Sequence, residues 1–413
     1  MRSRPVLIVL VLAGGLIPEI ALAQDWSQRG FIEARATGFV QRAPNDPTRV
    51  VADLLIREEV VARPATWLRF AAGADLRANS HDQVDDRWRI DLGDRGRLRP
   101  PVSIRRATAT ISRGPFTVDV GKQFIRWGKT DIVNPTDRFA PRDFLNVVET
   151  EFLAVSGVRA VAQAGAHDAF EVVWVPRLTT SRLPLLDQRW TAVPDDAPQV
   201  RLVDAGATVP AGSQAGVRWS RTGSRIEYAL SFFDGFNHLP NVDVRAGALP
   251  RVEVSTVYPP IRSYGADASL PTRWFSVKGE VAYVTSSSPA ADQYVIYVVQ
   301  AERQTGEWSL VAGYAGEVVT ARRAALTFAP DRGMTRSIVG RASYTIGPNR
   351  SVAVETAIRQ NLNGAYGKAE YSQAHGQHWR VTAAGVLIGG EADDFLGQYR
   401  RNSHGSLVLR YSF

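Results

Sequence analysis

One internal segment, FIRWGKTDIVNPTDRFAPRDFLNVVETE, combines many ionisable residues with Trp and Asn, and it spans residues 124–151. The candidate pore and constriction residues in this segment are Arg126, Lys129, Asp131, Asp137, Arg138, Arg142 and Asp143. Arginine forms bidentate hydrogen bonds with carboxylates and phosphates, so a group of this kind could attract small anions. The segment also contains tryptophan and asparagine, and this composition favours a packed, hydrogen-bonded loop.

Other kinds of chemistry find little support in the sequence. The chain has no cysteine, which excludes thiolate nucleophiles, disulfides and Cys-ligated metal sites. Its six histidines show no metal-ligand spacing and no nearby activated nucleophile. We therefore expect no catalytic residues, no metal and no cofactor. The net charge of +8 is spread along the chain, so nucleic acid is not an expected partner.

The elements that must position these residues alternate between polar and apolar side chains. In residues 67–78, Phe70 and Leu76 fall on one face of an extended chain, whereas Arg69 and Asp75 fall on the other. A period of two identifies β-strands, because successive side chains of a strand point to opposite faces. The same pattern recurs up to the C-terminus, and no segment of the mature chain has a convincing helical period. The fold class is therefore all-β.

The connections between the predicted strands fall into two length classes. Eight are tight turns rich in Gly, Pro, Asn and Ser, and nine are longer or more irregular. This alternation predicts a closed antiparallel transmembrane β-barrel of about 18 strands, with short periplasmic turns and long extracellular loops. The count treats residues 251–270 as one strand kinked at Pro259, and counts of 16 or 20 strands stay open.

The polar faces of the predicted strands would line the lumen, because an Arg or Lys exposed to lipid costs about 2–4 kcal/mol. Both signs of charge occur on these faces, as at Glu33, Arg57 and Asp75, and arginine greatly outnumbers lysine. Two interpretations remain open. The charges could form ion pairs that only stabilise the barrel, or their basic excess could favour anions.

Both ends of the chain carry signals. Residues 1–23 combine a basic start, a short apolar stretch and a small-residue end, which predicts a signal peptide cleaved near Ala23. Residues 24–413 would then form the barrel in the outer membrane of a Gram-negative bacterium. Tyr411 and Phe413 end the last strand in a way that resembles the assembly signal of outer-membrane barrels. The expected partners are outer-membrane lipid, lipopolysaccharide and the barrel assembly machinery, and the oligomeric state stays open.

The segment GKQFIRWGKTDIVNPTDRFAPRD, together with FEVVWVPRLTTSRLP, carries a family resemblance. It resembles uncharacterised proteobacterial outer-membrane barrels that are grouped with porin-like and alginate-export-like proteins. The matching positions are Gly121, Gln123, Trp127, Gly128, Asn134, Pro135, Asp137, Arg142, Asp143 and Pro176. The resemblance implies an outer-membrane barrel and leaves the solute unnamed.

These observations lead to an expected function. The leading interpretation is a porin-like channel for passive passage of small hydrophilic solutes, which could include anions, with residues 124–151 as a constriction loop. An external cap on the rim is the alternative place for this loop. The alternative functions are export or surface anchoring of a polysaccharide, and a plugged structural or adhesive barrel.

Overall fold

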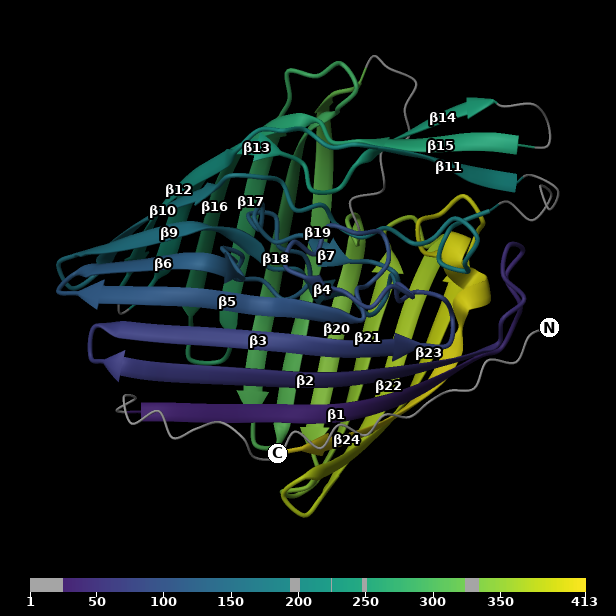
Figure 1. Cartoon of the computed structure of the whole chain (residues 1–413), viewed down its shortest axis with the longest axis horizontal. Helices are drawn as coiled ribbons and strands as arrows, with labels where there is room; N and C mark the ends of the chain where they lie inside the picture. The colour runs from purple at the N-terminus through teal and green to yellow at the C-terminus, as the bar shows by residue number, and fades with distance from the viewer. Residues whose placement is uncertain (1–24, 194–200, 224, 247–250, 324–333) are drawn as a thin grey trace.

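Strands, most of them paired antiparallel, make up most of the computed structural model, which describes residues 25–193, 201–223, 225–246, 251–323 and 334–413. Eighteen of the strands form a barrel, and β24 pairs with β1 to close it (Figure 1). The barrel strands are β1 (Asp25–Phe39), β2 (Val50–Ala65), β3 (Leu68–Asn79), β5 (Val102–Arg113), β6 (Phe116–Gln123), β9 (Val155–Ala164), β10 (Asp168–Val175), β12 (Gln214–Thr222), β13 (Glu227–Phe236), β16 (Pro260–Pro271), β17 (Ser276–Thr285), β18 (Gln293–Thr305), β19 (Trp308–Ala321), β20 (Ser337–Thr345), β21 (Arg350–Arg359), β22 (Gly364–His375), β23 (Trp379–Gly390) and β24 (His404–Ser412). The predicted closed antiparallel barrel of about 18 strands is confirmed.

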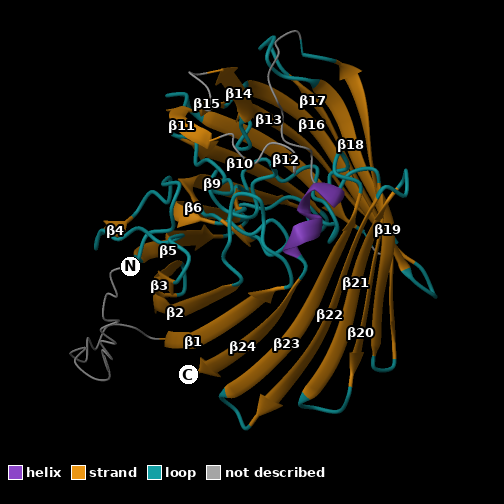
Figure 2. Ribbon diagram, turned by 90° about the vertical axis from the view of Figure 1, so that its right-hand side faces the viewer, coloured by secondary structure: helices purple, strands orange, loops and turns teal. Residues whose placement is uncertain are grey.

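The remaining elements belong to the long connections. The short strand β4 (Ile90–Asp91) pairs in parallel with β5, and β7 (Arg142–Asp143) pairs with β8 (Glu151–Phe152). A 3₁₀ helix, η1 (Gly397–Asn402), lies between β23 and β24. No helix among the described residues is long and apolar enough to cross a membrane. Figure 2 shows loop segments lying inside the ring of strands.

One predicted strand is wrong in its extent. The segment read as one kinked strand over residues 251–270 is two strands, β15 (Arg251–Val257) and β16. Only β16 joins the barrel, while β15 pairs with β11 (Arg201–Thr208) and β14 (Asn241–Ala246) in a small sheet beyond the long-loop rim (Figure 1). The break falls at Pro259, since proline has no N–H with which to continue a ladder. The count of 18 holds because β15 lies outside the barrel.

The register separates an apolar outer face from a charged inner face. Leu54, Leu387 and Leu407 point outward and are 41%, 72% and 54% exposed, as lipid-facing side chains should be. Inward positions pair charge with charge, as where Glu33 lies opposite Arg410 on the neighbouring strand. A one-residue slip would exchange the two faces, so burial of these charges fixes the register.

Apolar clusters lie on opposite sides of the lumen, among charged wall residues. Buried residues of β10, β13, β17 and β18 pack against the first part of the loop in a cluster that includes Trp127, Phe139 and Phe233. The ring centroids of Phe139 and Phe233 are 4.9 Å apart. Gly216 on β12 allows this approach, because a Cβ there would lie 2.6 Å from the Trp127 ring. This apolar contact anchors the first part of the loop to the side of the barrel that these strands form.

The topology predicts which rim faces outward. Because the chain has no cysteine, Ser287→Cys and Asp393→Cys in long connections, and Asn349→Cys in a tight turn, give three single-thiol variants. We expect an impermeant maleimide to label the first two on intact cells and the third only after lysis, since short turns face the periplasm. Labelling of Asn349→Cys on intact cells would reverse the orientation.

Candidate pore and constriction site

Residues 124–151 lie within the barrel and reach its inner wall at several points. The indole N–H of Trp127 donates to Glu171 on β10 at 2.7 Å. The backbone N–H of Asp131 donates to Gln300 on β18 at 2.9 Å. The carboxylate of Glu149, near the other end of the segment, contacts Arg35 on β1 and Lys368 on β22. The segment therefore crosses the lumen from one wall to the opposite one.

Glu280 on β17 is the main anchor of this segment. Its carboxylate accepts five hydrogen bonds from the loop, two from backbone and side chain of Thr136, two from Thr130 and one from the backbone N–H of Lys129. The distances lie between 2.7 and 3.2 Å, and Glu280 is only 3% exposed. A buried carboxylate is stable only when its lone pairs are satisfied in this way. The sequence places Glu280 on the inner face without indicating this role.

Several of the predicted site residues fold the loop itself. Asp137 accepts the backbone N–H groups of Trp127 and Gly128 at 2.6 and 2.7 Å, and its other oxygen lies 3.3 Å from Arg126 Nε. The guanidinium groups of Arg126 and Arg142 both lie 4.1 Å from the centre of the Phe152 ring. Asp137, Arg126 and Arg142 are thus brought together in the interior of the loop.

The other predicted residues are distributed around the lumen. Lys129 Nζ lies 3.3 Å from Glu227 and 3.6 Å from Asp267 on the wall. Asp131 approaches Lys278 at 3.8 Å and lines a wide cavity described below. Arg138 has no ion pair among the described residues, and its buried Nε has no hydrogen-bond partner.

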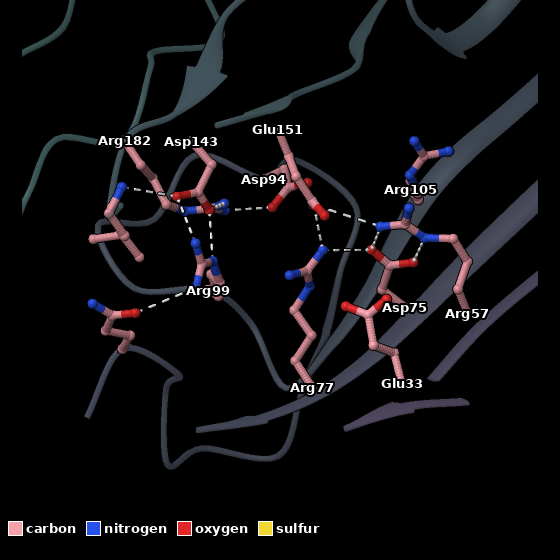
Figure 3. A network of polar contacts seen from close by, with 12 residues as sticks. Glu33, Arg57, Asp75, Arg77, Asp94, Arg99, Arg105, Asp143, Glu151 and Arg182 are labelled. Atoms are coloured by element: carbon pink, nitrogen blue, oxygen red, sulfur yellow. Dashed lines mark hydrogen bonds and ion pairs between the residues drawn. The ribbon is translucent and has the colours of Figure 1, made fainter. Parts of the chain in front are cut away.

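Asp143 belongs to a buried charge cluster that joins three long connections (Figure 3). Arg99 holds its carboxylate through two hydrogen bonds of 2.8 and 3.0 Å, and Arg182 adds a third of 3.0 Å. Arg182 also pairs with Asp94. Burial alone would raise the pKa of Asp143, but Arg99 and Arg182 outweigh it, so the pKa lies well below the usual range. The cluster therefore stays ionised and ties these connections together.

A second charge cluster lies on the wall formed by β2 and β3 (Figure 3). Arg57 binds Asp75 through two hydrogen bonds of 2.7 and 2.8 Å. Arg77 bridges Asp75, at 3.0 Å, and Glu151 of the loop, at 2.6 Å. This bridge fixes the end of the loop to the wall.

One buried histidine, His238, takes part in the packing of the loops. His238 Nδ1 lies 2.9 Å from the Ser181 hydroxyl, which also accepts the backbone N–H of Arg142. Burial, with help from Arg138 and Arg142, lowers the pKa of His238 to about 3, so its ring is neutral. The pair joins the connections after β10 and β13 to the lumen loop.

Two cavities lie on either side of the loop. The outer cavity, of about 480 Å³, lies on the side of the long connections and is lined by residues such as His81 and Trp190. The inner cavity, of about 760 Å³, extends toward the tight-turn rim along β17 to β22. Val148 and Thr150 line both cavities, so the two meet at this part of the loop.

The residues around the meeting point differ from those that the sequence indicated. Arg35, Arg77, Glu149, Glu151 and Lys368 line the outer cavity, whereas Asp131 lines the inner one. Arg35 and Arg77 are inward positions of period-two strands, and this is the only signal in the sequence that could have found them. The path of the loop brings Glu149 to Arg35 and Glu151 to Arg77.

Comparisons with known proteins agree with the fold. No protein-family model and no curated protein matches the sequence. Among solved structures, OccAB4 of Acinetobacter baumannii is similar, with a TM-score of 0.56 and 9% identity over 95% of this chain and 99% of that chain. OpdQ of Pseudomonas aeruginosa has a TM-score of 0.53 and 9% identity over 94% of this chain and 98% of that chain.

The outer membrane protein OpdK of Pseudomonas aeruginosa, also solved with vanillate, is similar over the same extent. Its TM-score is 0.54 and its identity 10%, over 95% of this chain and 99% of that chain. These likenesses span nearly the whole of each chain, so they concern the complete barrel and not one hairpin motif. The chain therefore has the fold of a porin-like outer-membrane β-barrel.

Proposed function

We propose that this protein is an outer-membrane channel for passive passage of small hydrophilic solutes, anionic solutes among them. The observation that carries the proposal is the pair of cavities that meet at Val148 and Thr150. One opens toward the long loops and the other toward the tight turns, so a solute could cross the barrel by passing the loop. Residues 124–151 would then act as the constriction.

The lining of the outer cavity supports small charged solutes. It presents the basic side chains Arg35, Arg77, Arg99, Arg189 and Lys368. Four carboxylates lie among them, so the cavity is mixed with a small basic excess. In a low-dielectric barrel such groups act strongly on a passing ion, and guanidinium groups suit a carboxylate. Vanillate, the molecule named with the similar OpdK structure, carries a carboxylate.

Planar-bilayer recording of the purified full-length protein tests the proposal. We expect discrete conductance steps and, in a KCl gradient, a reversal potential displaced toward that of chloride, because the basic excess favours anions. Liposome swelling should be faster with benzoate than with a neutral sugar of similar size. Bilayers that received detergent alone are the control. A protein that inserts and remains heat-modifiable but passes no current would be a plugged barrel, and the proposal would be wrong.

A further inference from the structure

The carboxylate of Glu149 lies between two cations of the pore wall. One of its oxygens accepts a hydrogen bond from Arg35 on β1, and the other lies 3.9 Å from Lys368 Nζ on β22. The two cations come from different parts of the wall, since β23 and β24 lie between these strands. Arg35, Lys368 and Glu149 all line the outer cavity, so a solute there has access to the same cations.

This contact is the main polar attachment of the adjoining part of the loop. Among the described residues, Glu149 makes the only ion pairs between residues 146–149 and the barrel wall. The backbone N–H of Val148 is bonded within the loop, to Asn146 at 3.2 Å. Val147 and Val148 add apolar packing against the wall cluster that contains Tyr366. Residues 146–149 are therefore held to the wall by one carboxylate and a small apolar contact. Thr150, in contrast, accepts a hydrogen bond from Arg142, and Glu151 is fixed to the wall by Arg77.

The same segment forms the boundary between the two cavities. Val148 and Thr150, which line both cavities, are the neighbours of Glu149 in the chain. Movement of Glu149 away from Arg35 and Lys368 would carry Val148 with it, while Thr150 stays bonded to Arg142. The width of the passage is thus coupled to whether the two cations hold Glu149.

We propose that Arg35 and Lys368 form a binding site for the carboxylate of a permeating solute, and that Glu149 occupies this site as an internal competitor. A solute carboxylate replaces Glu149 on the two cations, and residues 146–149 are released so that the passage widens beside Val148. This inference rests on the proposed channel function and adds a regulation to it. No covalent step is involved, because one carboxylate exchanges for another.

The exchange is energetically accessible. The side chains of Arg35, Lys368 and Glu149 are 30%, 19% and 19% exposed, so water screens their ion pairs. A tethered carboxylate acts as a competitor of roughly millimolar effective concentration. A solute carboxylate at millimolar concentration can therefore compete with it.

Two substitutions that each remove one negative charge distinguish release of the loop from a general change in the electric field of the lumen. Glu149→Gln removes the carboxylate that contacts Arg35 and Lys368. Glu370→Gln is the matched control, because Glu370 pairs with the same Lys368 at 3.0 Å and has no contact with the loop. Glu149→Asp keeps the charge but shortens the side chain, so it tests the reach of the contact.

Two quantities are measured: the single-channel conductance in KCl, and the benzoate concentration that produces half of the maximal change in current. Benzamide is the uncharged probe. We expect Glu149→Gln and Glu149→Asp to conduct more than wild type. Glu149→Gln should lower the half-saturating benzoate concentration about two- to fivefold, the range for loss of a part-exposed ion pair. Glu370→Gln should change conductance little, and benzamide should have no saturable effect in any variant.

The outcome that would overturn the inference is an equal response to Glu149→Gln and Glu370→Gln, since a general change of lumen charge would then suffice. Wild-type benzoate affinity in Glu149→Gln would also overturn it. Absence of current in all variants including wild type would instead reject the channel function itself.

Discussion

Deletion of Phe413 is expected to reduce the amount of folded barrel in the outer membrane by about tenfold or more, because closure of the barrel involves this residue. Its backbone N–H and C=O exchange hydrogen bonds of 3.0 and 2.9 Å with Gly30 on β1. Its ring is 47% exposed on the outer face, next to Tyr411. Without it, two backbone groups of Gly30 would face hydrocarbon unpaired, at a cost of several kcal/mol each.

The measurement is the heat-modifiable band in outer-membrane fractions, with periplasmic degradation products followed in parallel. Phe116→Ser is the matched control, because Phe116 is an exposed aromatic residue near the tight-turn rim that lies far from the C-terminus. A double variant, Tyr411→Ser with Phe413→Ser, keeps the backbone and tests the aromatic signal separately. Wild-type membrane levels of both C-terminal variants would reject the assembly role proposed for Tyr411 and Phe413.

Substitution of Glu280 by alanine is expected to release the lumen loop while the barrel persists. Five donors of the loop lose their acceptor, and each donor left buried and unsatisfied costs about 1–3 kcal/mol. The backbone ladder of β17 does not depend on this side chain, so the strands should still pair. The expected result is a larger and noisier single-channel conductance with a lower thermal stability.

Bilayer recordings and thermal unfolding of the purified variant check this expectation. Glu355→Ala provides the control, because Glu355 is also on the inner face but pairs with Arg341 of the wall, at 3.4 Å. If Glu280→Ala matched wild type in conductance and in stability, Glu280 would not be the anchor of the constriction. An increase in conductance in both variants would indicate an effect of lumen charge alone.

The strand pattern could be predicted from the sequence because it depends only on residues that are neighbours in the chain. Alternation at Phe70 and Leu76 against Arg69 and Asp75 requires only that neighbouring side chains of a strand face opposite ways. Tight turns are encoded by the residues within them. The exception is β15, which ends at Val257. The alternating pattern runs on from β15 across Pro259 into β16, and nothing local indicates that β15 lies outside the barrel.

The structure of the constriction loop could be predicted from the sequence only in part. Its composition predicts hydrogen-bonded packing, and the structure contains such packing around Asp137. The composition of the loop does not indicate which of its charged side chains face the pore. Arg142 and Asp143 are adjacent in the chain, yet Arg142 packs on Phe152 inside the loop and Asp143 joins Arg99 and Arg182.

The all-β class, a closed barrel of about 18 strands and the charged inner face could be predicted from the sequence, since they follow from period-two alternation and turn chemistry. The exact count of 18 depends on the strand pairing in the folded barrel. The meeting of Arg35 near the N-terminus, Glu149 in the loop and Lys368 near the C-terminus is likewise visible only in the folded chain. The physical reason is closure, because pairing of β1 with β24 brings the two ends of the chain together. The lumen loop then selects, by its buried hydrogen bonds to Glu280, which wall residues remain free to face a solute.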